Sequence, residues 1–219
     1  MKTLLIPTAA NSQGLSGARF KTRLTLTSFG SARAGSVRLQ VLPSVGKAGL
    51  SRSIVLPPGA TTTLGDVLGD LGYEGGAAIE LAYAEDEPLY VTAEVYADSP
   101  TGRYTTVVPV IAEPLNDPRV VTPGIRSDSA SRTNIGCANV VGSEYAVSAE
   151  VHSADGSTLG TVSLAVPARG WVQTLVPFAV SDGCVVWNWA TWSGPGTPSG
   201  VSCFAVVVDN ATNDGSQLR

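Results

Sequence analysis

Two stretches that resemble each other decide the fold, Phe20-Lys21-Thr22-Arg23-Leu24-Thr25-Leu26-Thr27 and Ser131-Arg132-Thr133-Asn134-Ile135-Gly136-Cys137-Ala138. In each, a basic residue and a threonine are followed by apolar residues at every second position. Alternation with period two is typical of a β-strand that has one buried face. The two stretches lie about half a chain length apart, so they predict that one strand occurs twice.

Further matching segments follow in the same order and at a nearly constant spacing. They pair 37–41 with 147–151, 56–59 with 166–170, 79–81 with 187–189, and 91–95 with 203–207. Ordered self-similarity of this kind is the signature of a repeat. The sequence therefore predicts two copies of one module, over 1–112 and 113–219. Pro114 and Pro118 predict a stiff connector between them.

The composition favours an all-β fold. Charged residues make up 15% of the chain, below the roughly 25% usual in soluble domains, and the chain has 24 glycines and 14 prolines. Turn clusters at 44–47, 98–102, 154–156 and 193–200 separate the short alternating segments. We expect each copy to be an antiparallel β-sandwich of immunoglobulin type, with one helical turn at 64–71.

Charge and hydropathy exclude two classes of partner. The net charge of −4 argues against nucleic acid, which selects a basic surface. No stretch reaches the roughly 18 apolar residues of a membrane helix, so no membrane insertion is expected. The apolar run at 4–6 is too short for a signal peptide and is interpreted as the first strand. The low charge and the many Thr, Ser and Val residues predict a secreted or cell-surface location.

Three further motifs carry a resemblance to a family. They are the Arg-Thr-Asn-Ile-Gly run at 132–136, the Pro-x-x-Gly-Trp turn at 167–171, and the Val-Val-Asp-Asn-x-Thr run at 207–212. The chain resembles tandem immunoglobulin-like modules that occur as appendages of large secreted or surface-anchored bacterial proteins. The resemblance implies a β-sandwich, export and an accessory role, and it brings no catalytic residues.

The cysteines suggest a disulfide. When the two copies are aligned, Cys137 lies where the first copy has Leu26, and Cys203 lies where it has Val91. Both positions face the core, on the pair of strands that a disulfide joins across the two sheets of antibody-like domains. We expect a Cys137–Cys203 bond with Cys184 left over; the alternative is that all three are small buried hydrophobic residues.

The tryptophans are the best ligand-binding candidates. Trp187 and Trp189 share the alternation of Ile79 and Leu81, so we expect them in the core of the second copy. Trp192 lies beside the loop at 193–200, and Trp171 lies on a turn. These two are the predicted ligand-binding residues, with surface glycans as the ligand.

The strand at 201–208 predicts an interface. The first copy has the polar outward residues Thr92 and Glu94, but Phe204, Val206 and Val208 are apolar. A strand that is apolar on both faces is covered on both. The cover is the first copy, another subunit, or another part of a longer protein.

No residue pattern predicts catalysis or a cofactor. His152 is the sole histidine, and no nucleophile motif accompanies it. The Asx-rich loop from Asp209 to Asp214 is either a calcium site or a set of plain turns. We therefore expect a non-catalytic extracellular module, a spacer, adhesin segment or self-assembling subunit, whose partners are other protein subunits, including copies of itself, or glycans. The alternative is a carbohydrate-binding accessory module.

Overall fold

The structure is a computed structural model of the whole chain, and it describes residues 1–14, 17–29, 35–85, 88–99, 102–112, 120–189 and 200–218. Nearly all regular structure in these ranges is β-strand, arranged in antiparallel sheets, so the prediction of an all-β fold is confirmed. The chain divides into two compact units, Met1–Pro114 and Leu115–Arg219, called here the N-terminal and the C-terminal unit. The predicted connector, with Pro114 and Pro118, lies outside the described residues.

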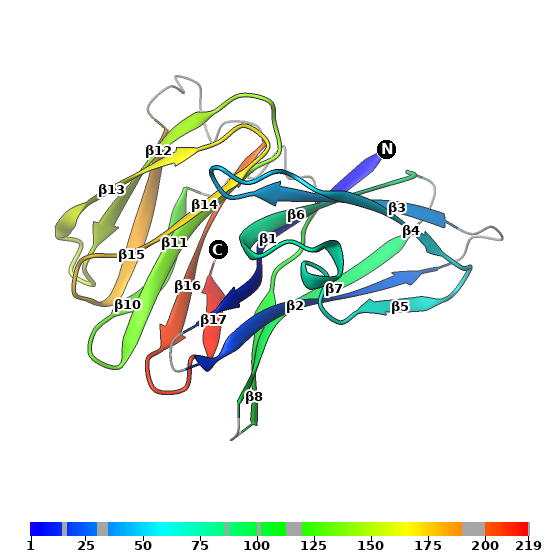
Figure 1. Cartoon of the computed structure of the whole chain (residues 1–219). Helices are drawn as coiled ribbons and strands as arrows, with labels where there is room; N and C mark the ends of the chain where they lie inside the picture. Colours follow the sequence, from blue (N-terminus) through cyan, green and yellow to red (C-terminus); the bar gives the residue numbers. More distant parts are fainter. Residues whose placement is uncertain are drawn as a thin grey trace. The chain divides into compact units, whose positions relative to one another are not determined.

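The described part of the N-terminal unit is built almost entirely of β-strands (Figure 1). Its elements are β1 (Lys2–Gln13), β2 (Arg19–Ser28), β3 (Gly35–Pro43), β4 (Ser51–Leu56), β5 (Thr61–Leu64), η2 (Gly69–Leu71), β6 (Gly75–Tyr83), β7 (Leu89–Ser99), β8 (Gly102–Val108) and β9 (Ile111–Ala112).

Two strand orders build the sandwich of this unit, β4-β3-β6-β1 and β5-β2-β7-β8. The long β1 connects them, because it pairs with β6 along most of its length and with β2 at its end, where Ser12 lies opposite Phe20. The core between the layers contains the alternating residues that the sequence predicts, among them Leu24, Leu26 and Ile79. Val67 and Leu68, in the predicted helical turn, are buried there too.

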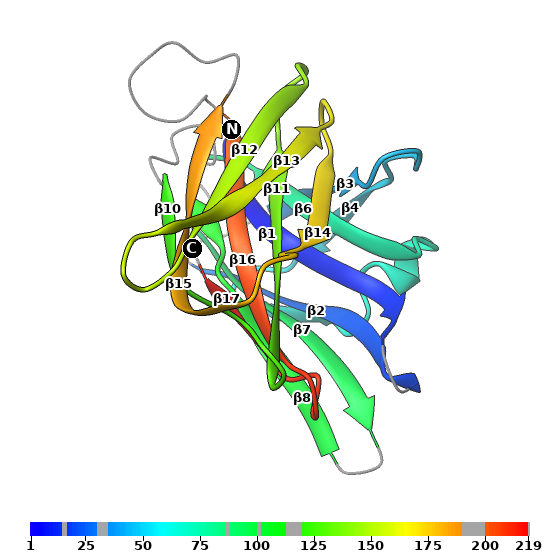
Figure 2. The same cartoon turned by 90° about the vertical axis from the view of Figure 1, so that its left-hand side faces the viewer.

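The C-terminal unit is a second sandwich, which Figure 2 turns towards the viewer. Its strands are β10 (Val121–Ser127), β11 (Ser131–Asn139), β12 (Tyr145–His152), β13 (Thr158–Val166), β14 (Trp171–Leu175), β15 (Val180–Trp189), β16 (Val201–Asp209) and β17 (Gly215–Leu218). One sheet has the order β10-β15-β12-β13 and the other β14-β11-β16-β17.

The two units order their strands alike. If the strands of each unit are numbered from its own first strand, both units have the order 4-3-6-1 in one sheet and 5-2-7-8 in the other. The sandwiches are compatible with immunoglobulin-like modules, but several strands have other neighbours. Here the fourth strand pairs with the third and the seventh with the second, whereas in the constant-type sheets the fourth strand pairs with the fifth and the seventh with the sixth. In the immunoglobulin constant-type sheet the second strand lies between the first and the fifth, whereas here β2 has β5 on one side and β7 on the other.

Candidate functional site

A disulfide joins Cys137 on β11 to Cys203 on β16. The two residues lie directly opposite each other in one sheet, with Cα atoms 4.0 Å apart, and both are buried. The expectation that the bond crosses between the sheets is therefore wrong, because β11 and β16 are hydrogen-bonded neighbours. In the N-terminal unit the corresponding opposed pair is Leu26 and Val91.

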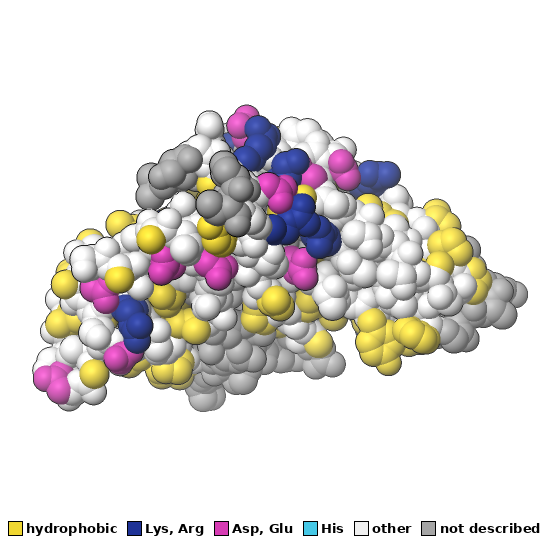
Figure 3. Space-filling model, turned by 90° about the horizontal axis from the view of Figure 1, so that it is seen from below, with side chains coloured by type: hydrophobic (Ala, Val, Ile, Leu, Met, Phe, Trp, Pro, Cys, Tyr) yellow, Lys and Arg dark blue, Asp and Glu magenta, His cyan; other side chains and the backbone are white. Residues whose placement is uncertain are grey.

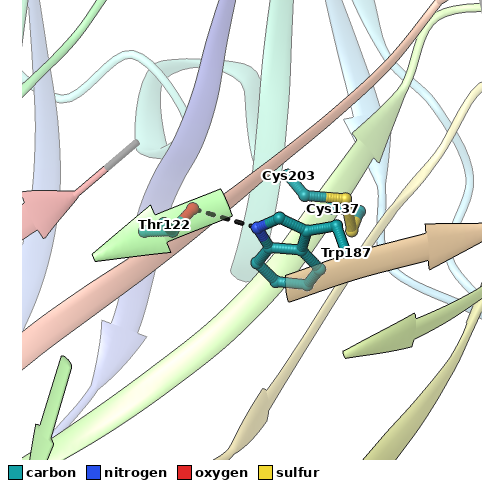
Figure 4. Close-up of a disulfide and its surroundings, with 4 residues drawn as sticks. All are labelled: Thr122, Cys137, Trp187 and Cys203. Atoms are coloured by element: carbon teal, nitrogen blue, oxygen red, sulfur yellow. Dashed lines mark hydrogen bonds between the residues drawn. A yellow bond between two sulfur atoms is a disulfide. The ribbon is translucent and has the colours of Figure 1, made fainter. Parts of the chain in front are cut away.

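Trp187 reaches the core from β15, in the opposite sheet, and lies beside the disulfide (Figure 4). It is 1% exposed, and its indole Nε1–H donates to Thr122 Oγ1 at 2.9 Å. Thr122 is buried as well, so the hydrogen bond satisfies a donor that has no access to water. Trp189 is half-buried and packs against the same core. Both tryptophans contribute to packing.

Trp171 packs against a neighbouring ring and is buried, which differs from the expected ligand contact. It is 7% exposed and stacks on Phe204, with ring centroids 6.5 Å apart and planes 18° from parallel. The preceding turn holds Arg169 at a φ of 50°, and the Arg169 side chain donates to the Val140 carbonyl. Trp192 lies outside the described residues.

Phe204, the first of the three predicted interface residues, is fully buried. Its ring lies over Gly136, where an added Cβ would come within 2.8 Å of Phe204 Cζ. Val208 is buried and Val206 is half-buried. Part of the cover on this strand therefore comes from Trp171, a residue of the same unit.

Cys184 and His152 lie opposite each other on β15 and β12. The thiol is free and half-exposed. His152 Nε2 lies 3.1 Å from Glu150 Oε1, and Nδ1 lies 3.2 Å from the Gly156 carbonyl oxygen. Because both ring nitrogens face oxygen acceptors, neither is turned to take a proton from Cys184. The arrangement stabilises the β12–β13 turn and does not form a cysteine–histidine dyad.

The Asx-rich loop uses its oxygen atoms in hydrogen bonds within the protein. Asp209 Oδ1 accepts from the backbone N–H groups of Ala211 and Thr212, both at 2.8 Å, and these bonds hold the pKa of Asp209 below its usual value. Arg132 donates to Asn210 Oδ1 and Asn213 Oδ1, both at 3.0 Å. In the described ranges no group of three or more His, Cys, Asp or Glu residues is placed to hold a metal ion.

The N-terminal unit contains a surface that the sequence analysis missed. We name it the threonine face: the outward side chains of β5, β2 and the start of β7, which are Thr25, Thr27, Thr61, Thr63, Thr92, Tyr90 and the adjoining Phe29. Thr27 lies opposite Thr61 on one side and Tyr90 on the other. The hydroxyl oxygens of Thr27 and Thr61 are 3.0 Å apart, so the two groups share a hydrogen bond.

Two aromatic rings lie at one end of this face. Phe29 and Tyr90 pack edge to face, with ring centroids 5.4 Å apart and planes at 83°. The two side chains are 56% and 63% exposed, respectively, although they are large and mainly apolar. The backbone N–H of Phe29 donates to the Pro88 carbonyl oxygen. This hydrogen bond holds the end of β2, next to Phe29, beside the start of β7, which contains Tyr90.

Paired charges lie beyond the other end of the threonine face. Arg23 lies 3.2 Å from Glu94, Lys21 lies 3.5 Å from Asp66, and the buried Tyr96 ring lies under the guanidinium of Arg23 at 5.1 Å. Figure 3 shows basic and acidic side chains next to one another on one face of the molecule rather than as a field of one sign. In these partly buried pairs the opposite charges neutralise each other.

A narrow cleft in the N-terminal unit completes the set of candidate sites. It is lined by Leu39, Arg52, Leu64, Val67, Asp70 and Leu71. The cleft is too narrow to hold a water molecule, whereas ligand pockets have roughly 300–1,000 Å³. We therefore assign it no ligand.

Comparisons with known proteins add no relative. No model of a protein family matches the chain, and no curated protein or solved structure matches it. Within the described residues, no helix is long and apolar enough to cross a membrane.

Proposed function

We propose that the chain is a non-catalytic extracellular module that acts through surface contacts, as a spacer, adhesin segment or self-assembling subunit. In this proposal the two units are tandem immunoglobulin-like repeats of a secreted or surface-anchored bacterial protein. The partners are other protein subunits, including copies of the same chain.

One observation carries the proposal: the disulfide occupies a packing position. The N-terminal unit builds the corresponding opposed pair from Leu26 and Val91. The cysteines Cys137 and Cys203 therefore replace core residues in a shared strand order, which supports a structural role for the bond and not a redox role. A buried disulfide that constrains a sandwich fits a protein that works outside the reducing cytosol.

The alternative of a carbohydrate-binding accessory module based on Trp192 and Trp171 gains less support. Trp171 is stacked on Phe204 and is 7% exposed, so its ring offers no open platform. Sugar binding at that position would require the stack to open.

Sedimentation of the intact protein over a wide concentration range tests the structural role, together with mass spectrometry of its thiols. We expect the Cys137–Cys203 bond to be intact after secretion, and association of the protein with itself or with other surface proteins at high concentration. A strictly monomeric particle that captures no surface protein, or reduced cysteines in the exported protein, would contradict the proposal.

A further inference from the structure

We propose that the threonine face of the N-terminal unit binds a neutral glycan chain, with Phe29 and Tyr90 as the stacking platform. This inference goes beyond the structural role and does not rest on it. It also differs from a site at Trp192, because all the residues involved belong to the other unit.

The aromatic pair provides the first argument. Exposed aromatic rings that are locked in place lose little conformational entropy on binding, because only two χ angles define each of them. Phe29 and Tyr90 hold each other edge to face at 5.4 Å while more than half of each side chain stays in water. A ring with an apolar face and, for Tyr90, a polar tip matches a sugar, which has apolar C–H faces and hydroxyls at its edges.

The hydroxyl rows provide the second argument. Thr27 and Thr61 form one row with Tyr90, and Thr25 forms the next with Thr63. Neighbouring strands are about 4.8 Å apart and alternate residues about 6.8 Å apart, so the rows form a flat grid of groups that both donate and accept. Thr27 and Thr61 share a hydrogen bond of 3.0 Å, and Thr25 and Thr63 share one of 3.4 Å. Each pair keeps one hydroxyl hydrogen and several lone pairs, with which a ligand that has many hydroxyls can form hydrogen bonds.

Charge selects a neutral ligand. The basic side chains next to the grid are already paired, Arg23 with Glu94 at 3.2 Å and Lys21 with Asp66 at 3.5 Å. An anionic polysaccharide is held by cations that are free to pair with it. From Phe29 to Thr25 the face extends over four residue steps, or about 14 Å at 3.4 Å per residue, enough for a short oligosaccharide.

The test uses the full chain on an array of neutral and anionic oligosaccharides, with isothermal titration against each glycan that binds. We expect at least one neutral glycan to bind. Tyr90→Ala and Phe29→Ala should each weaken that binding tenfold or more, while Tyr90→Phe should keep most of it. Val55→Ala is the matched control, because Val55 is 67% exposed on β4, in the other layer of the sandwich, and this variant should bind like the wild type. Circular dichroism and the Tm verify that each variant is folded.

Three results would overturn the inference: binding to anionic glycans only, no glycan bound by the folded protein, or neutral-glycan binding that survives Tyr90→Ala and Phe29→Ala. In the last case, loss of binding in Trp192→Ala would place the sugar site in the C-terminal unit. None of these results bears on self-association or on the disulfide, which test the structural role separately.

Discussion

Breaking the Cys137–Cys203 bond should destabilise the C-terminal unit alone. Two forms of the protein break it in different ways. Reduction of the unfolded protein, followed by refolding in reductant, leaves the cysteines in place. The double variant Cys137→Leu/Cys203→Val instead introduces the pair that the N-terminal unit uses at the corresponding positions, Leu26 and Val91. Together they separate the effect of the cross-link from the effect of packing.

The expected magnitude follows from the length of the closed loop. The two cysteines are 66 residues apart in the sequence. In the chain-entropy description, closing a loop of that size lowers the entropy of the unfolded chain by about 15 cal/mol/K, which corresponds to about 4 kcal/mol at 25 °C. The double variant should lie within about 1.5 kcal/mol of the reduced protein, because Leu and Val fill space in a buried site where the neighbours must adjust.

Tryptophan fluorescence during urea unfolding measures this effect selectively. All four tryptophans, at 171, 187, 189 and 192, belong to the C-terminal unit, and the buried Trp187 lies beside the disulfide (Figure 4). With a slope of about 2 kcal/mol/M, a loss of about 4 kcal/mol moves the midpoint by about 2 M. The NMR signals of the β2 and β7 backbone amides, followed through the same urea titration, report the N-terminal unit, whose midpoint should not move.

Two results would refute the reasoning. A midpoint shift below about 0.5 M after complete reduction would mean that the unfolded chain gains little freedom. An equal shift in the N-terminal unit would mean that the effect does not arise from this loop. Cys184→Ser is the control for the remaining thiol, and it should leave both midpoints unchanged because Cys184 forms no disulfide.

Three further predictions concern single contacts. Gly136→Ala should destabilise the C-terminal unit by about 1–3 kcal/mol in the same urea assay, because the new Cβ would meet the Val172 carbonyl oxygen at 2.4 Å; Gly142→Ala, which meets nothing within 4 Å, should stay near the wild type. Thr122→Val should cost about 1–3 kcal/mol, because the buried Trp187 Nε1–H loses its acceptor, and an unchanged midpoint would show that another acceptor replaces it. Hydrogen bonds from the Ser153 hydroxyl and the Ser157 N–H lower the pKa of Asp155 from 3.8 to about 2. The stabilisation of the β12–β13 turn by the Asp155 carboxylate should therefore be complete above about pH 4 and be lost as the pH falls through about 2. The NMR shift of the Ser157 amide should follow this titration in the wild type and stay constant in Asp155→Asn.

The sequence predicted those features that depend on alternation along one strand. Leu24, Leu26 and Ile79 face the core as period two requires, and Trp187 fills the equivalent core of the other unit. The side-chain period of a strand is 2, so one buried face fixes the direction of every residue on it. Prediction within single strands was therefore reliable.

Features that depend on which strands are neighbours were not predictable in this way. The two cysteines were identified from their core-facing positions, but the geometry of the bond was wrong because β16 lies beside β11 and not across from it. Trp171 was expected at the surface because it follows a turn. Its position on Phe204 depends on β14 pairing with β11, a tertiary arrangement.

The threonine face was missed for the same reason. The Thr25-x-Thr27 and Thr61-x-Thr63 patterns are visible in the sequence, but each alone indicates only an outward-facing strand. Only the pairing of β2 with β5 and β7 brings them together with Tyr90.

The corresponding faces of the two units show how one scaffold supports different surfaces. When the two units are aligned so that Leu26 matches Cys137 and Val91 matches Cys203, other positions match as well. The row Thr27, Thr61 and Tyr90 then corresponds to Ala138, Trp171 and Ser202.

One row therefore exposes hydroxyls and a phenol, whereas the other holds a buried indole and buried small residues. The inward residues on the same strands pack the core of each sandwich. The outward residues of the two rows can therefore differ without a change in strand order. Of these two described rows, only the one in the N-terminal unit therefore presents exposed hydroxyls, because the matching row of the C-terminal unit is buried.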